Sequence, residues 1–163
     1  MQEIERKFRV LSEAYKAQAF RKEKIIQGFL SRHPERTVRV RIKGEQGFLT
    51  IKGKSPDGGV SRFEWEKEIS VDEAEALFEI CEPGRIEKVR HLVKLGEHVF
   101  EVDEFHGENK GLTVAEIELS APDEKYASPE WLGDEVTGDN RYYNSQLSKF
   151  PYSEWKNNQD QNI

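Results

Sequence analysis

Apolar and polar residues alternate with a period of two along eight segments of the chain, a pattern typical of β-strands whose two faces differ. Glycine, proline and other turn residues separate most of these segments, as at residues 44–47, 55–59 and 83–84. The predicted strands comprise residues 2–10, 23–31, 37–44, 47–54, 61–69, 85–95, 97–106 and 111–120.

Helices are predicted at the connections between strands. One begins at Ser12 and runs to about Phe20, and a second runs from Asp72 to Cys81, with an acidic residue three positions after its first. Residues 128–130 can start a short helix with proline at its first position, and 140–150 can form another. Many strands with helices at the connections indicate an α+β fold, mainly β, built on an antiparallel sheet or barrel.

The polar faces of the predicted strands carry like charges two residues apart. On a strand, residues two apart point to the same side. The basic sets are Arg39, Arg41 and Lys43; Lys52 and Lys54; Lys88 and Arg90. The acidic sets are Glu64, Glu66 and Glu68; Glu101 and Asp103; Glu116 and Glu118. In the first strand Glu3, Glu5 and Lys7 share one face.

Two interpretations fit this charged face. An open antiparallel sheet with one side in water explains any single strand. Like-charged neighbours repel each other, however, so the whole set favours ligands of opposite sign: a polyanion for the basic strands and metal cations for the acidic ones. About eight strands can also close into a barrel that holds one small ligand. The charged face would then line a tunnel, with helices covering the apolar outer face.

The net charge, the cysteine content and the lack of long apolar stretches exclude several classes of protein. The 163 residues carry a net charge of −6, which disfavours a nucleic-acid binder. Cys81 is the only cysteine, so an intramolecular disulfide is excluded. No stretch approaches the roughly 20 apolar residues of a membrane span, and the charged first twenty residues contain no signal core. We expect a cytoplasmic protein without a membrane or nucleic-acid partner, either a monomer or a homodimer.

Several motifs follow one another in the order of a known family. Glu3-Ile4-Glu5-Arg6-Lys7 fits a Glu-x-Glu-x-Lys signature in the first strand. The later motifs are Gln27-Gly28-Phe29-Leu30, Arg39-x-Arg41, Lys52, Glu64-x-Glu66, Lys88-x-Arg90, Asp103, Glu116-x-Glu118 and Tyr142-Tyr143-Asn144. The chain thus resembles the CYTH domain, of the triphosphate tunnel metalloenzyme superfamily. The resemblance implies one tunnel domain over residues 1–152, followed by a polar tail, 153–163.

The resemblance also implies roles for individual side chains. Phosphate oxygens would be bound by Lys7, Arg39, Arg41, Lys52, Lys88 and Arg90. Metal ligands, for Mg²⁺ or Mn²⁺, would be Glu3, Glu5, Glu64, Asp103, Glu116 and Glu118. Glu5, Lys7 and Glu118 are the expected catalytic residues. Phe29 stands where bacterial members often have tyrosine, so a hydroxyl contact to the substrate is absent there.

The function that the resemblance implies is metal-dependent hydrolysis of a triphosphate-containing small molecule, with inorganic tripolyphosphate as the first choice. A class IV adenylate cyclase, which makes cyclic AMP and pyrophosphate from ATP, shares the fold. A thiamine or nucleoside triphosphatase is a third possibility. A non-catalytic polyphosphate-binding module is disfavoured, because binding a polyanion alone would need only the basic residues.

Overall fold

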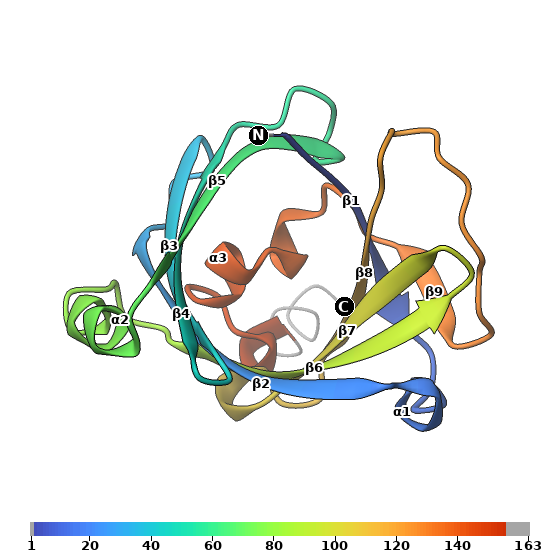
Figure 1. Cartoon of the computed structure of the whole chain (residues 1–163), viewed down its shortest axis with the longest axis horizontal. Coiled ribbons are helices and arrows are strands. Elements are labelled where there is room, and N and C mark those ends of the chain that lie inside the picture. Colours follow the sequence, from blue (N-terminus) through green and yellow to red (C-terminus); the bar gives the residue numbers. More distant parts are fainter. Residues whose placement is uncertain (1, 156–163) are drawn as a thin grey trace.

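Eight strands form a closed antiparallel barrel in the computed structural model, which describes residues 2–155 (Figure 1). They are β1 (Gln2–Val10), β2 (Arg21–Ser31), β3 (Arg36–Lys43), β4 (Gln46–Gly53), β5 (Ser61–Ile69), β6 (Ile86–Leu95), β7 (His98–Phe105) and β8 (Thr113–Glu118). All eight were predicted, and the ends agree to within two residues. The closed barrel with a charged interior is therefore confirmed.

Strand β1 closes the barrel and has three partners. Its first residues pair with β5, Glu3 standing opposite Arg62, and its later residues pair with β8, where Glu5 faces Glu118. Beyond these, Phe8 and Val10 pair with a ninth strand, β9 (Leu132–Glu135), which the alternation pattern missed because it is only four residues long. The first strand thus brings its own charged residues beside two of the three acidic strands, β5 and β8.

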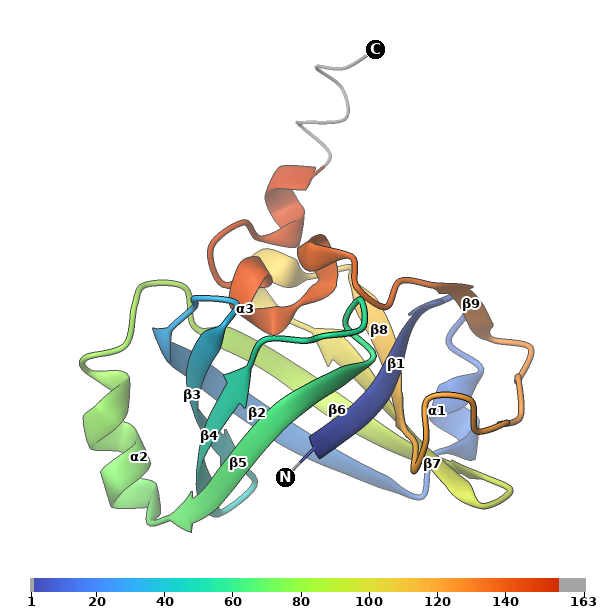
Figure 2. The ribbon, with the colours of Figure 1, turned by 90° about the horizontal axis from the view of Figure 1, so that it is seen from above.

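The helices are short: α1 and α2 pack on the outside of the barrel, whereas α3 lies at one of its ends (Figure 2). They are α1 (Tyr15–Gln18), α2 (Val71–Phe78) and α3 (Asn144–Leu147), with single turns η1 (Gly107–Asn109) and η2 (Asn140–Tyr142). A capping box begins α2: the Glu73 amide donates to Ser70 Oγ, and the Ser70 amide donates to the Glu73 carboxylate. The prediction of this helix over Asp72 to Cys81 was wrong by one residue at its start and by three at its end, and the helix predicted from Ser12 to about Phe20 is shorter, since α1 has only four residues. Within residues 2–155, none of the helices is long and apolar enough to cross a membrane.

Two other helix predictions differ from the structure. Residues 128–130 form no helix, and the chain goes from there into β9. The stretch 140–150 is not one helix but η2 followed by α3, because Tyr143 between them has extended backbone. The predicted tail, 153–163, falls mostly outside the described residues. Trp155, near its start, packs edge-on against Tyr142.

The apolar outer face is buried beneath α1 and the segment that leads into β9. Trp131 is 2% exposed and packs edge-on against Tyr15 and Phe100, and its indole nitrogen donates to Gln18. Replacing Trp131 with Ala should lower the free energy of unfolding by about 3–5 kcal/mol, because it leaves a large cavity. Urea denaturation measures this. Phe20→Ala, which removes an exposed ring, serves as control, and equal losses in both variants would contradict the packing role.

The C-terminal segment closes one end of the barrel (Figure 2). Tyr142 and Leu147 pack with Phe29, Ile86 and Phe105, whose strands line the barrel at this end. Gly84 allows the close approach of the segment, since its φ is +108° and a Cβ there would lie 1.8 Å from the Ser148 carbonyl oxygen. The interior therefore ends in an apolar seal on this side.

Candidate active site

The barrel interior contains a narrow inner compartment next to the C-terminal segment. Its volume is about 50 Å³. Six basic and two acidic residues line it, together with polar and aromatic ones: Lys7, Arg39, Lys52, Arg62, Lys88, Arg90, Glu5, Glu116, Phe29, Thr37, Thr50, Tyr143, Asn144 and Ser145. Lys7, Lys88 and Arg90 are buried. The inner compartment is thus a strongly cationic pocket with one closed end.

A wider outer compartment follows toward the other end, with a volume of about 370 Å³. All twelve lining residues are charged, five basic and seven acidic: Arg39, Arg41, Lys43, Lys52, Arg90, Glu3, Glu5, Glu64, Glu66, Glu101, Glu116 and Glu118. Glu66 and Glu118 are exposed, so solvent reaches this compartment. Charge therefore changes along the tunnel, from cationic at the closed end to mixed and more acidic at the open one.

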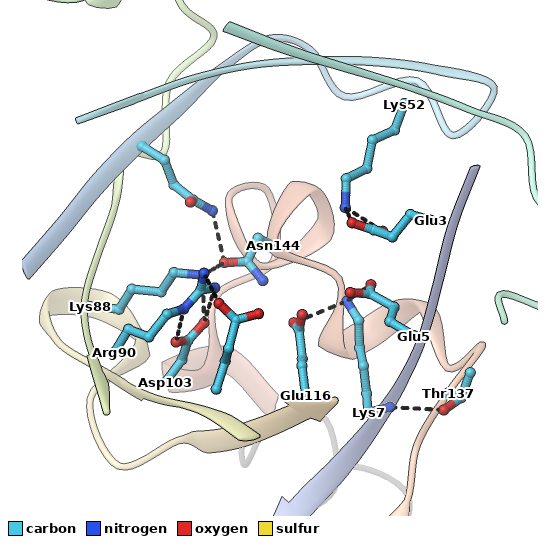
Figure 3. Close-up of polar contacts among 12 residues, drawn as sticks. Glu3, Glu5, Lys7, Lys52, Lys88, Arg90, Asp103, Glu116, Thr137 and Asn144 are labelled. Carbon is cyan, nitrogen blue, oxygen red and sulfur yellow. Dashed lines mark hydrogen bonds and ion pairs between the residues drawn. The ribbon is translucent and has the colours of Figure 1, made fainter. Parts of the chain in front are cut away.

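Asp103 holds two basic side chains at the wall of the inner compartment. Its carboxylate accepts from Arg90 Nε and Nη2 at 2.8 and 3.0 Å and lies 2.7 Å from Lys88 Nζ (Figure 3). Burial acts to raise the pKa of Asp103, but Arg90 and Lys88 outweigh it and lower that pKa. Burial lowers the pKa of Lys88 to about 8 in spite of Asp103. Both oxygens of Asp103 are already engaged, which favours positioning of the cations over the predicted metal ligation.

Arg90→Met should destabilise the protein by about 3 kcal/mol, because it leaves the buried Asp103 carboxylate with Lys88 as its remaining cationic partner. Adding Asp103→Asn should recover part of that loss, since the buried charge is then removed as well. Urea unfolding of the single and double variants measures both effects. A double variant no more stable than Arg90→Met would show that this ion pair is not what holds the wall.

Lys7 lies between two acidic residues on neighbouring strands. Its Nζ is 3.6 Å from Glu116 and 3.9 Å from Glu5 (Figure 3). The same atom lies over the Tyr143 ring, 4.5 Å from the centroid. Burial would lower the pKa of Lys7, but Glu116 and Glu5 raise it. Lys7 is therefore a charged, buried ammonium. The pairing of β1 with β8 holds Glu116 directly opposite Lys7.

The carboxylates fall into two electrostatic classes. Burial raises the pKa of Glu5 to about 8, with repulsion from Glu116 as the next cause. Burial also raises the pKa of Glu64 to about 7, helped by Glu3, and raises that of Glu118. The pKa values of Glu116 and Glu3 are instead lowered, against the effect of burial, by cations that include Lys7 and Lys52 respectively. Glu5, Glu64 and Glu118 thus lack sufficient positive charge around them.

These crowded carboxylates fit a divalent cation. Oxygen ligands are the ones that Mg²⁺ and Mn²⁺ prefer, and a cation would offset both the burial and the repulsion from Glu116 that raise the pKa of Glu5. Among residues 2–155, no three acidic, histidine or cysteine side chains converge into a ready-made metal cluster. Mg²⁺ is commonly bound by one or two carboxylates together with substrate phosphates and water. The donor set therefore suits an ion whose coordination a phosphate ligand completes.

A second basic pair lines the wall on β3. Arg39 Nη2 donates to Thr50 Oγ1 at 3.3 Å, and Thr50 in turn donates to Glu66 at 2.8 Å. Arg41 lies 3.6 Å from Glu66. Burial, with Arg39 and Arg90 nearby, lowers the pKa of Arg41 to about 9. Because the Nε atoms of Arg39 and Arg41 are buried without a partner in the described residues, this pair has unused capacity for an anion.

The structure brings nearly all the predicted site residues to the tunnel. Every predicted phosphate-binding residue and every predicted metal ligand except Asp103 lines one of the two compartments. The lining also includes residues for which no binding or catalytic role was predicted: Thr37, Thr50, Arg62, Lys43, Glu66, Glu101, Tyr143, Asn144 and Ser145. The alternation placed Lys43, Glu66 and Glu101 on the charged faces of their strands, so the sequence indicated that these side chains could line the tunnel. Of the motif Tyr142-Tyr143-Asn144, Tyr142 packs in the apolar seal, whereas Tyr143 and Asn144 line the inner compartment.

Comparison with known protein families shows to which family this chain is related. A family model described as the CYTH domain matches residues 1–152. The chain belongs to the CYTH domain family. An inorganic triphosphatase of Acetivibrio thermocellus is 46% identical to this CYTH protein over 159 residues, which are 94% of this chain and 97% of the relative. An inorganic triphosphatase of Nitrosomonas europaea is 36% identical over 152 residues, 91% of this chain and 97% of the relative.

Solved structures support the same relationship. The crystal structure of the inorganic triphosphatase NE1496 aligns with this CYTH protein at a TM-score of 0.61 and 32% identity, over 90% of this chain and 93% of the other. A protein from Pyrococcus horikoshii aligns at a TM-score of 0.61 and 25% identity, over 74% of this chain and 81% of the other. The barrel and its tunnel thus belong to the family fold.

Proposed function

We propose that this CYTH protein hydrolyses inorganic tripolyphosphate to phosphate and pyrophosphate, with a divalent cation present. The observation that carries the proposal is the tunnel lining. A cationic pocket at the closed end suits a polyphosphate, and an outer compartment lined entirely by charged residues suits phosphate and metal ions. Two relatives that the chain matches over most of its length are named inorganic triphosphatases, which supports the same substrate.

The basic residues bind the phosphate chain and stabilise the charge that develops in the reaction. Phosphoryl transfer depends mainly on positioning and electrostatic stabilisation. The inner compartment would hold the deeper phosphoryl groups through Lys7, Lys88 and Arg90, and Asp103 keeps the latter two oriented. Arg39, Arg41 and Lys52 line the outer compartment and would bind the outermost group. Guanidinium groups suit this task because they donate two parallel hydrogen bonds to phosphate oxygens.

The acidic residues that would hold Mg²⁺ or Mn²⁺ are Glu3, Glu5, Glu64, Glu116 and Glu118. When bound there, the cation supplies polarisation of the phosphoryl oxygens and activation of water. Glu5 and Glu116 line both compartments, so they lie where the phosphate chain passes from one to the other. The metal-ligand role that the resemblance implied for Asp103 becomes a positioning role in this proposal.

The closed inner end sets the direction of attack. The attacking and leaving oxygens stand roughly in line in phosphoryl transfer. Water reaches the tunnel from the open, outer side, so it attacks the outermost phosphorus and the deeper pyrophosphate leaves. Glu118 is exposed in the outer compartment and faces Glu5 across the β1–β8 pair. Its carboxylate would take the proton of the attacking water, and Lys7 would offset the charge on the leaving pyrophosphate.

The outer compartment also distinguishes the candidate substrates. Within the described residues its lining includes no aromatic or apolar side chain that would bind adenine or thiamine. Tripolyphosphate, ATP and thiamine triphosphate should therefore be assayed side by side with Mg²⁺ or Mn²⁺, and phosphate, pyrophosphate and cyclic AMP separated. We expect the highest kcat/KM with tripolyphosphate. Cyclic AMP from ATP, or a higher kcat/KM with thiamine triphosphate, would overturn the assignment.

A further inference from the structure

An amide on the C-terminal segment forms part of the inner compartment. Asn144 Oδ1 lies 2.7 Å from Lys88 Nζ and 2.8 Å from Gln27 Nε2 (Figure 3). Gln27 is fully buried on β2, and Lys88 is 2% exposed on β6. The side chain of Asn144 is therefore tied to two strands of the barrel from a segment that comes more than a hundred residues after Gln27.

Chemistry fixes which way this amide faces. An ammonium group can only donate hydrogen bonds, so the Asn144 atom beside Lys88 must be the oxygen. Gln27 also donates to that oxygen. The amide nitrogen of Asn144 is then turned away from both, toward the inside of the barrel (Figure 3). In residues 2–155 no acceptor receives a hydrogen bond from it, which leaves two N–H donors at the inner compartment.

The segment that carries Asn144 is firmly seated. Next to it, Tyr143 contacts Lys7, and Leu147 is 1% exposed in the apolar seal. Ser148 Oγ donates to the Gly84 carbonyl oxygen at 2.6 Å. An inner compartment of about 50 Å³ has room for a few water-sized groups, and hence for a phosphoryl group but not for a nucleoside. Asn144 thus belongs to a fixed end wall.

We propose that Asn144 donates to the terminal phosphoryl group at this wall, so that the site selects linear phosphate chains that have an unsubstituted end. The inference rests on the proposed function for its substrate and adds the requirement for a free end. An acceptor oxygen of the deepest phosphoryl group would meet the amide N–H groups, while Lys88 binds the same group. A substituent on that phosphorus would have no space, whereas the outer compartment leaves the other end of the chain less restricted.

Two compounds test whether the site requires a free terminal phosphoryl group or merely attracts a polyanion. Cyclic trimetaphosphate has three phosphoryl groups and no free end, and a dinucleoside triphosphate is blocked at both ends. Neither should be hydrolysed at a rate above a few per cent of that with tripolyphosphate. Hydrolysis of either compound at a rate comparable to that of tripolyphosphate would overturn the proposal.

The direct test is binding of pyrophosphate, which has free ends and requires no turnover. Calorimetry should show binding about 10- to 100-fold weaker in Asn144→Ala, because a hydrogen bond to a charged group is lost. Asn144→Asp should lose at least as much, since it keeps the acceptor for Lys88 but replaces the donor with a negative charge. The matched control is Asn140→Ala, an exposed asparagine of the same segment that does not line the compartment.

Steady-state kinetics distinguish a contact between Asn144 and the substrate from a merely structural role of Asn144. Loss of a contact to the deep, non-reacting phosphoryl group should raise KM for tripolyphosphate by a similar factor, with kcat within about threefold of wild type. Thermal unfolding of each variant shows whether the end wall is still formed. Unchanged pyrophosphate affinity in folded Asn144→Ala and Asn144→Asp, or no pyrophosphate binding by the wild type, would overturn the proposal. Tight, Asn144-dependent binding without hydrolysis would instead refute the proposed function alone.

Discussion

Replacing Lys7 with Met should lower kcat for tripolyphosphate hydrolysis by about 100- to 1000-fold. Lys7 is the ammonium that lies between Glu5 and Glu116 and against the Tyr143 ring, where the leaving pyrophosphate would be bound. Methionine fills a similar volume without the charge, so the loss reports on stabilisation of the leaving group rather than on packing. Phosphate release with Mg²⁺ or Mn²⁺ measures it.

The matched control for this variant is Lys67→Met. Lys67 is an exposed lysine on β5 that lines neither compartment, so its replacement should leave kcat unchanged. Circular dichroism and thermal unfolding establish that both variants are folded. A folded Lys7→Met protein with turnover close to that of the wild type would remove Lys7 from the mechanism.

Removing divalent cations with a chelator should stop hydrolysis, and Glu5→Gln should raise the Mg²⁺ or Mn²⁺ concentration for half-maximal rate at least about tenfold. Burial and Glu116 raise the pKa of Glu5 although Lys7 lies 3.9 Å away, as expected for a carboxylate whose negative charge is not fully balanced. Glutamine keeps the shape but loses the charge that would attract the cation. A titration of the initial rate with each metal ion gives the two concentrations.

Glu87→Gln provides the comparison for the metal titration, since Glu87 is an exposed carboxylate on β6 outside both compartments. Its half-maximal metal concentration should equal that of the wild type. Activity that survives chelation, or a metal requirement that Glu5→Gln leaves unaltered, would argue that the carboxylates serve only to orient Lys7 and its neighbours.

The alternation of residues was enough to predict the strands and the charged face of the sheet, because most of the strands have one charged and one apolar face. Glu3, Glu5 and Lys7 illustrate this: their period of two places them together whatever the rest of the chain does. The same rule predicted that Arg39 and Arg41 share the tunnel with Lys88 and Arg90. Closure of the barrel needed the family resemblance as well, since an open sheet has the same alternation.

Features that depend on register and on tertiary packing could not be predicted in this way. The pairing of Asp103 with Lys88 and Arg90 follows from how β6 lies against β7, which a pattern within one strand does not contain. The C-terminal segment has no periodicity, because its residues pack on the end of the barrel and not on a sheet face. Asn144 was correctly predicted to be helical, but nothing in the helix pattern indicated that its side chain lines the inner compartment.

The division of the tunnel into two compartments also could not be predicted from the sequence. Each strand runs from the apolar seal towards the open end. The position of a charged residue along its strand therefore decides which compartment its side chain lines. Lys88 lies deep and Glu118 lies near solvent for this reason. Strand alternation indicates the face of a side chain but not its depth.

In the complex that we propose, the tunnel holds a triphosphate with its free end at the closed wall and a divalent cation among the carboxylates. The most direct test is a crystal soaked with tripolyphosphate and a slowly reacting divalent cation. We expect one terminal phosphorus beside Lys7, Lys88 and Asn144, and the cation beside Glu5 and Glu116 or beside Glu3 and Glu64. Tripolyphosphate bound outside the barrel, or a cation bound away from these carboxylates, would contradict the account.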